Sequence, residues 1–244
     1  MILGIDDVKQ FKVFFDVIHE DTSVIEFQVF NDKIICSVLN KSHTNFYKVT
    51  FSREFFSVYD VGDVELFSVD IDDLYKLLKS IKTGDLLLEV NGNYLVATVT
   101  SPEGNRRIFE YVLQDNYSQI PQFPTIVFDT EFEVNTVDLN QSVIDLNLIG
   151  TDKYKMAVSG DSLFISSSED SMTKYSHEID IDPEIPTKMI SSVYYVDYIE
   201  KILKFNKVNK VVEIEFGDTK PLKYTYHGDN VLIEGLIAPL LVEE

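Results

Sequence analysis

Cysteine and positive charge are both scarce in this chain of 244 residues. Its single cysteine, Cys36, excludes a disulfide within the chain and a zinc site built from cysteines, and it is typical of a reducing compartment. Lys and Arg number 21 against 41 Asp and Glu, which gives a formal net charge of −20. Such a surface repels nucleic acid on average, so contact with DNA requires the few cations to be gathered in one place.

Long apolar runs and a basic leader are also lacking. No stretch reaches about 18 apolar residues, so no membrane-spanning helix is predicted. Residues 1–7 carry no basic charge and no apolar core, so we do not expect a signal peptide. We therefore expect a cytoplasmic protein, or a nuclear one if the source is eukaryotic. The composition, 45% hydrophobic and 25% charged, is that of a globular protein, and the length predicts one or two domains.

The strongest internal signal is a repeat. Residues 69–82 match residues 194–207, with apolar residues at helical spacing and lysines recurring in both copies. Each copy precedes a predicted strand. The strand at 212–216 alternates apolar and acidic residues, as a half-buried strand does, whereas 86–90 is more continuously apolar and is expected to be buried on both faces.

A weaker echo lies earlier in each half. Residues 7–18 and 138–149 both have apolar residues at helical spacing and precede strand-like runs and turns. Each half therefore reads as helix, hairpin strands, helix, hairpin strands, which predicts an α+β fold of two similar domains. Residues 114–124 contain two prolines and show no helical or strand period, which predicts an extended linker. We expect a domain at 1–112, a linker at 113–128 and a second domain at 129–244.

Lysines gather on the predicted helices. On a helical wheel, Lys76 and Lys79 lie opposite the apolar face of helix 71–82, and Lys82 lies on its flank. A lysine stripe opposite an apolar face is ordinarily a solvated surface. Its recurrence in an acidic chain favours a surface facing phosphates, for which lysine is suited because the contact is independent of sequence. Nine of the 21 cations are candidates for this role: Lys9, Lys12, Lys76, Lys79, Lys82, Lys201, Lys204, Lys207 and Lys210.

Motifs for catalysis are weak. Residues 160–163 spell Gly-Asp-Ser-Leu, the opening block of a serine esterase family, but the flanking strand-like runs predict a hairpin turn. Ser162 is kept as a remote alternative, a hydrolase nucleophile that would need a base nearby. The four histidines have no metal-binding spacing, and no glycine-rich phosphate loop is present. We therefore predict no catalytic residue, no metal and no cofactor.

Six short segments are spread along the whole chain: Leu236 to Glu244, Pro221 to Tyr226, Ser42-His43, Lys76-Leu77-Leu78-Lys79, Ile149-Gly150 and Ile120-Pro121. Together they resemble the proliferating cell nuclear antigen family of DNA sliding clamps. Each segment is only moderately specific, but their order is highly so. The lack of a basic localisation run and the compact length favour an archaeal type.

The resemblance implies a DNA clamp fold, in which each of two tandem domains places its helices on one face of antiparallel sheets. It implies a homotrimeric ring whose helices line a channel around double-stranded DNA. The expected role is that of a processivity factor in DNA replication and DNA repair, not an enzyme. The expected partners are DNA polymerase, a clamp loader, and a ligase and a nuclease that bind through short peptide motifs, with no membrane partner.

The resemblance also implies two protein-binding sites. The partner-peptide pocket would use Leu39, Phe46, Ile120, Pro121, Pro221, Leu236, Ala238, Pro239 and Leu241. Ordinary packing is the alternative, above all for Leu236 and Leu241. The subunit interface would pair strands at about 107–112 and 173–179, where arginines 106 and 107 are expected to meet Glu178 and Asp180. Its residues would be Arg107, Ile108, Glu110, Val112, Lys174, Ser176 and Glu178.

The sequence departs from the family at helix 138–149, which carries no cation. Gln141 and Ile144 stand where arginine is expected, and Asp197 and Glu200 put acid beside the second lysine helix. Two alternatives therefore stay open alongside the esterase. The chain is a subunit of a heteromeric ring whose partners supply the cations, or it is a checkpoint-type clamp that recruits partners without serving the replicative polymerase.

Overall fold

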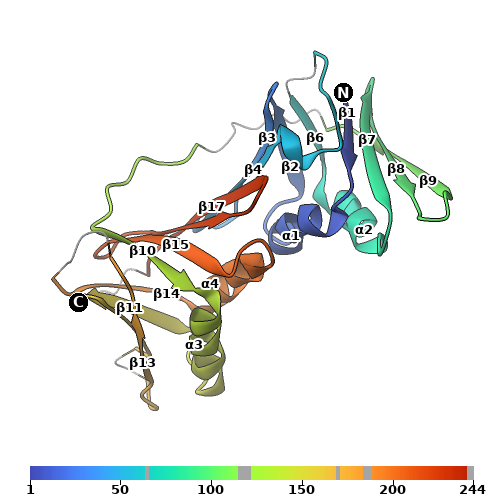
Figure 1. Cartoon of the computed structure of the whole chain (residues 1–244). Helices are drawn as coiled ribbons and strands as arrows, with labels where there is room; N and C mark the ends of the chain where they lie inside the picture. The colour runs from blue at the N-terminus through green and yellow to red at the C-terminus, as the bar shows by residue number, and fades with distance from the viewer. Residues whose placement is uncertain (64–65, 115–121, 169–170, 184–187, 241–244) are drawn as a thin grey trace. The chain divides into compact units, whose positions relative to one another are not determined.

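The computed structural model describes the chain except for residues 64–65, 115–121, 169–170, 184–187 and 241–244. The described residues form four α-helices, two short 3-10 helices and 17 strands (Figure 1). They fall into two compact units. Unit 1 comprises Met1–His43, Tyr47–Gln122 and Gly228–Ile233, and unit 2 comprises Thr44–Phe46, Phe123–His227 and Glu234–Glu244. The domain boundaries at residues 112 and 129 stay predictions.

Unit 1 contains two sheets and two α-helices, α1 and α2, which pack side by side (Figure 1). One sheet has the order β5-β1-β7-β8-β9, and β4-β3-β2-β6 are neighbours in the other. The elements are β1 (Ile2–Ile5), α1 (Val8–Ile18), β2 (Val24–Val29), β3 (Lys33–Leu39), β4 (Asn45–Ser52, whose first two residues belong to unit 2), η1 (Arg53–Phe55), β5 (Val58–Asp60), β6 (Leu66–Asp70), α2 (Ile71–Ser80), β7 (Asp85–Asn91), β8 (Tyr94–Thr100) and β9 (Arg106–Val112).

Unit 2 repeats this plan, again with its two α-helices packed together. One sheet has the order β13-β12-β11-β14, and β10-β15-β16-β17 are neighbours in the other. The elements are β10 (Thr130–Asn135), α3 (Thr136–Leu148), β11 (Lys153–Ser159), β12 (Ser162–Ser166), β13 (Ser176–Asp180), β14 (Ile190–Tyr195), α4 (Val196–Leu203), η2 (Lys204–Lys207), β15 (Val211–Phe216), β16 (Leu222–His227) and β17 (Val231–Ile237, whose first three residues belong to unit 1).

The predicted α+β class, with helices and antiparallel hairpins in the same order in both halves, is confirmed. The sequence reading missed the strands that open each unit, β1 and β10. The second lysine helix is also not continuous, because α4 ends at Leu203 and a 3-10 helix carries Lys204 and Lys207. Helix α3 begins at Thr136, two residues before the predicted start, since the side chain of Asn135 accepts a hydrogen bond from the Val137 amide and caps the helix there.

Strand β15 is half-buried as predicted, with Val212, Ile214 and Phe216 buried and the two glutamates between them half-exposed. The expectation that residues 86–90 are buried on both faces is wrong. In β7, Leu86 and Leu88 are buried while Leu87 is half-exposed. The strand lies in an antiparallel sheet, in which one covered face is sufficient, so a run of leucines does not require two.

An N-cap and a buried apolar face fix where helix α2 begins and which of its side chains face solvent. Its N-cap Asp70 accepts hydrogen bonds from the amides of Asp72 and Asp73, at 2.9 and 3.2 Å. Leu74, Leu77 and Leu78 are buried, so the opposite side of the helix faces outward. Burial of three leucines contributes about 5 to 9 kcal/mol to the free energy of unfolding. That is far more than any surface ion pair supplies, so it decides which side chains point to solvent.

Gly84, between α2 and β7, offers a stability test. Its φ is +106°, and an added Cβ would lie 2.1 Å from the Thr100 carbonyl oxygen. Gly92 also has a positive φ, +57°, but nothing lies within 4 Å of its Cβ position. We expect Gly84→Ala to lower the free energy of unfolding by about 2 to 4 kcal/mol and Gly92→Ala by about 1 kcal/mol. Urea unfolding followed by circular dichroism measures both, and equal losses would contradict the steric argument.

Candidate functional site

The candidate lysines of unit 1 lie on the outward side of α1 and α2 or, for Lys82, just beyond the end of α2. Lys76, Lys79 and Lys82 are exposed, as the helical wheel predicts, and so is Lys9. Lys12 is half-exposed and its Nζ lies 3.7 Å from Asp16 Oδ1 on the same helix. Such pairs are worth at most about 1 kcal/mol in water, so they leave these ammonium groups available to another anion.

An aromatic contact fixes the two helices of unit 1 to each other. The rings of His19, just after α1, and Tyr75, on α2, stack with centroids 3.9 Å apart. The Nζ of Lys79 lies 5.7 Å from the centroid of the same tyrosine ring. The stack therefore holds the lysine-bearing faces of α1 and α2 in a fixed relation within the unit.

The candidate lysines of unit 2 lie in the second copy of the repeat and just beyond it. Lys204 and Lys207 of η2 and Lys210 beyond it are exposed, while Lys201 of α4 is half-exposed. The apolar residues between them, Ile199, Ile202, Leu203 and Phe205, are buried. Asp197 and Glu200 are exposed on α4, so acidic groups share this surface.

Helix α3 has a different surface. Val137, Ile144 and Leu148 are 64%, 51% and 83% exposed, and at this spacing they share one side of the helix with Gln141. The helix contains no lysine or arginine and two aspartates, Asp138 and Asp145. Where the family resemblance leads us to expect cations, this helix therefore exposes a mainly apolar stripe. We call it the α3 stripe and define it as residues Val137, Gln141, Ile144 and Leu148.

The residues of the expected peptide pocket differ in how far they are buried. Phe46 and Leu236 are buried, while Leu39, Pro221, Ala238 and Pro239 are half-exposed. The backbone N–H of Ala238 donates to the Thr44 carbonyl at 2.7 Å, which pins the chain beyond β17 beside the start of β4. Ile120, Pro121 and Leu241 lie outside the described residues.

Two residues that the sequence reading missed lie against this group. The ring of Phe123 lies edge-on to the ring of Phe46, with centroids 5.1 Å apart and planes at 90°. The Nζ of Lys223, on β16, lies 5.7 Å from the centroid of Phe123. Lys223 lies inside the segment that carries the family resemblance, but nothing in the sequence links it to residue 123.

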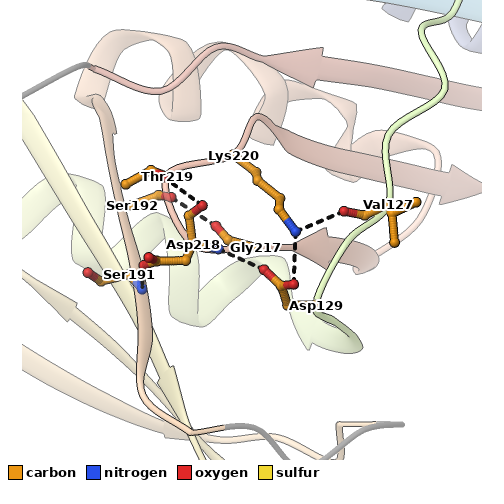
Figure 2. Close-up of polar contacts among 8 residues, drawn as sticks. All are labelled: Val127, Asp129, Ser191, Ser192, Gly217, Asp218, Thr219 and Lys220. Carbon is orange, nitrogen blue, oxygen red and sulfur yellow. Dashed lines mark hydrogen bonds and ion pairs between the residues drawn. The ribbon is translucent and has the colours of Figure 1, made fainter.

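The chain entering unit 2 is tied down by a polar network (Figure 2). The Nζ of Lys220 donates to Asp129 Oδ1 at 2.8 Å and to the Val127 carbonyl at 2.9 Å. The other carboxylate oxygen of Asp129 accepts from the Asp218 amide at 3.0 Å. Ser191 and Ser192 at the start of β14 bond to the same turn. The end of the predicted linker therefore has a fixed position on the β15–β16 turn.

The residues of the expected subunit interface lie on two edge strands. Strand β9 ends the five-stranded sheet, and Ile108 and Val112 on it are 63% and 60% exposed. Arg107 and Glu110 are exposed too, and the Arg107 guanidinium lies 5.8 Å from the centroid of Phe109. Strand β13 ends a sheet in unit 2, with Ser176 and Glu178 exposed and Lys174 exposed just before it.

Residues 160–161 form the hairpin turn that the sequence predicts, and Ser162 is the first residue of β12 after that turn. Its Oγ donates to Glu178 Oε1 at 2.9 Å. A histidine instead meets Ser142, whose Oγ lies 2.8 Å from Nδ1 of His177, but Ser142 is fully buried. Among the described residues, therefore, the serine–histidine contact joins α3 to β13 and offers no exposed nucleophile. No described helix has the length and hydropathy needed to cross a membrane.

The Asp129–Lys220 pair predicts a dependence of stability on pH. The Lys220 hydrogen bond lowers the pKa of Asp129 below its ordinary 3.8. A depressed carboxylate pKa stabilises the fold above the unfolded pKa, and the effect is lost as the pH falls through the folded pKa. Wild type should therefore exceed Asp129→Asn in free energy of unfolding at pH 6, and the difference should be lost as the pH falls below 3.8 through the lowered pKa of folded Asp129. Urea titrations measure it. Asp229→Asn, which also removes one charge, is the control, and an equal loss in both variants would contradict the role of Lys220.

Comparison with known proteins agrees with the sequence resemblance. The DNA polymerase sliding clamp of Methanothermobacter thermautotrophicus is 29% identical over 228 residues, covering 91% of this chain and 89% of that protein. The DNA polymerase sliding clamp of Pyrococcus furiosus is 24% identical over 247 residues, covering 98% and 97%. No family model matches the chain.

Solved structures show the same fold over the whole chain. PCNA from Thermococcus kodakaraensis matches with a TM-score of 0.88 at 21% identity, covering 98% of this chain and 99% of that one. A chain of the PCNA2–PCNA3 complex from Sulfolobus tokodaii matches with a TM-score of 0.84 at 22% identity and the same coverage. The chain is therefore a relative of the archaeal DNA polymerase sliding clamps and has the fold of proliferating cell nuclear antigen.

Proposed function

We propose that the chain is a DNA sliding clamp, which assembles into a trimeric ring around double-stranded DNA and tethers DNA polymerase to it. The observation that carries this proposal is the segregation of charge. The chain has a net charge of −20, yet nine of its 21 cations lie on or beside α1, α2 and α4, on sides that point away from the core. The relatives named as DNA polymerase sliding clamps support the same conclusion.

The charge pattern suits sliding. A homotrimer would carry 3 × (−20) = −60 overall and 3 × 9 = 27 of these lysines. Lysine contacts to phosphate gain affinity from counterion release and carry no sequence information, so DNA would be held weakly and in any register. Closure of the ring retains the DNA, and tethering a polymerase raises its effective concentration at the primer end without new base contacts.

Edge strands supply the means of closure. An exposed edge strand with apolar side chains is prone to pair with another chain, and β9 offers Ile108 and Val112 at such an edge. We propose that β9 of one subunit pairs with β13 of the next. Glu178 on β13 already accepts a hydrogen bond from Ser162, which orients its carboxylate but leaves its second oxygen to accept from Arg107 of the neighbouring subunit.

Partner proteins would bind beside Phe46. Residues Leu236, Ala238 and Pro239 lie within the short segment 236–239 of unit 2, and the Ala238–Thr44 hydrogen bond brings that segment next to Phe46. A clamp loader, polymerase, ligase or nuclease would insert an apolar segment of a short peptide there. Apolar side chains gathered at a chain end with half-exposed prolines fit such a role.

One observation favours a second candidate, a subunit of a heteromeric ring. The α3 stripe is apolar and its helix is acidic, so a homotrimer would carry this cation-free surface three times. The Sulfolobus tokodaii structure is a complex of PCNA2 with PCNA3, so two different chains of this fold can assemble with each other. In that case partner subunits would supply cations, and this chain alone would not form a closed trimer.

The native mass of the purified chain separates the two candidates. Size-exclusion chromatography with multi-angle light scattering should give about three times 28.0 kDa for a homotrimer. Polymerase extension on primed circular DNA, with and without a clamp loader, then tests the activity. A trimer that leaves the product length unchanged would favour a checkpoint-type clamp, and a monomer would favour the heteromeric ring.

Reversing one charge tests the interface. Arg107→Glu should convert the trimer to monomers, because it places a carboxylate opposite Glu178 along a shared strand edge. Light scattering across a range of protein concentrations should show at least a tenfold weaker assembly, about 1.4 kcal/mol per interface. Arg53→Glu, at an exposed arginine of η1, is the matched control. A trimer that survives Arg107→Glu would discard β9 as the interface.

Neutralising lysines tests the DNA-facing surface. The change of Lys76, Lys79, Lys201 and Lys204 to Gln should leave the native mass intact and impair loading or sliding, because their ammonium groups no longer attract phosphates. The slope of log affinity against log salt should become shallower by about 0.9 for each phosphate that is no longer neutralised. Gln at Lys33, Lys41, Lys48 and Lys188, outside these helices, is the control. Unchanged processivity in the first variant would count against these lysines.

A further inference from the structure

Phe123 lies against a position built to hold an aromatic ring. Its ring presses edge-on against Phe46 at 5.1 Å, and the ammonium of Lys223 lies 5.7 Å from its centroid. Aromatic pairs favour this edge-to-face arrangement, and an ammonium group near a ring centroid is attracted by the ring quadrupole. An aliphatic side chain in the same place would gain neither interaction.

Both residues that hold the ring are fixed by the sheet. Phe46 is in β4 and is 5% exposed, and its carbonyl oxygen lies so close to Gly235 that a Cβ there would come within 2.5 Å of it. Lys223 is in β16 and forms an ion pair with Glu215 on the neighbouring strand, with their side chains only 21% and 22% exposed. The position therefore exists whether or not Phe123 occupies it.

Phe123, in contrast, comes from a segment without helix or strand. Residues 122–128 have no regular structure, and the Phe123 side chain is half-exposed. The chain is next held at Val127, whose carbonyl accepts from Lys220, and at Asp129. Val127 is four positions after Phe123, a reach of up to about 13 to 14 Å for extended chain. The ring can therefore leave Phe46 without disturbing the network that anchors the segment.

We propose that Phe123 occupies, in the free chain, the aromatic-binding position of the partner pocket, and that an aromatic side chain of an incoming peptide displaces it. This inference rests on the proposed function, because it assigns a regulation to the same pocket. Phe123 then competes with every partner and lowers their apparent affinity by the fraction of chains in which the position is open. Partners without an aromatic residue would be excluded, since they could not replace the interactions that Phe123 gives up.

A tryptophan reporter tests whether the position is occupied. The chain contains no tryptophan, so Phe123→Trp provides a single emitter. In the full-length protein we expect blue-shifted emission, as for a shielded indole, and a red shift when Phe46→Leu is added because the edge-to-face partner is removed. Solvent-like emission in the single variant would overturn the inference, and it would do so without bearing on the proposed partner pocket.

Peptide binding tests the competition. The probe is a fluorescein-labelled, twelve-residue polar peptide with two phenylalanines, and its partner peptide has alanine at both positions. Phe123→Ala and Phe123→Leu in the full-length chain should each bind the phenylalanine peptide about three- to tenfold more tightly than wild type, as expected if the position is closed in most chains. Val127→Ala, 80% exposed in the same segment, is the matched control and should change nothing.

Three results are decisive. Tighter binding in both the Ala and the Leu variant, with a red shift of the Phe123→Trp emission on adding the phenylalanine peptide, supports displacement. Weaker binding in both variants overturns it, because Phe123 would then form part of the pocket wall. If wild type and both variants bind neither peptide, the proposed partner pocket itself is contradicted. The emission of the Phe123→Trp variant still reports, independently of peptide binding, whether the side chain at position 123 is docked.

Discussion

The burial of the apolar faces of α1, α2 and α4 is the constraint on which the rest depends. Each helix can bury its leucines, isoleucines and phenylalanines only against the core of its own unit. Because the helix has a 3.6-residue period, its lysines then face outward. In most proteins that result is merely a solvated surface. Here the remainder of the chain is strongly acidic, so the same geometry gathers nine of the 21 cations on or beside these helices, while most of the acids lie elsewhere.

How far the sequence predicts this fold depends on what periodicity can report. A 3.6-residue period names the buried side of a helix, and a period of two names the buried side of a strand, so α2, α4 and β15 are predicted well. The period does not say whether a second layer covers a sheet, and the leucines of β7 therefore suggested a burial that the antiparallel sheet does not provide. It also does not distinguish an α-helical turn from a 3-10 turn, which is why η2 was read as the end of one helix.

The candidate site divides along the same line. The lysines were found from sequence because their spacing is local and recurs after 125 residues. Phe123 was not, because its significance comes from Phe46 and Lys223, which lie far from it along the chain and on different strands. Asp129 and Lys220 are also far apart in the sequence. Their ion pair depends on a turn in which Thr219 has a φ of +52°, and no local sequence pattern predicts that conformation. Contacts between remote segments are a product of the fold, so they are available only once the fold is known.

Helix α3 shows that the constraint does not by itself make a cationic surface. Its core side buries Leu139, Val143 and Leu146, yet its outer side exposes Val137, Ile144 and Leu148. Charges farther apart than about 8 to 10 Å are largely screened at physiological salt, so lysines on other helices compensate only for nearby parts of this surface. In the proposed ring each subunit would then contribute three lysine-bearing helices and one neutral to acidic helix. Fewer released counterions mean weaker attachment, which a closed ring tolerates because topology rather than affinity retains the duplex.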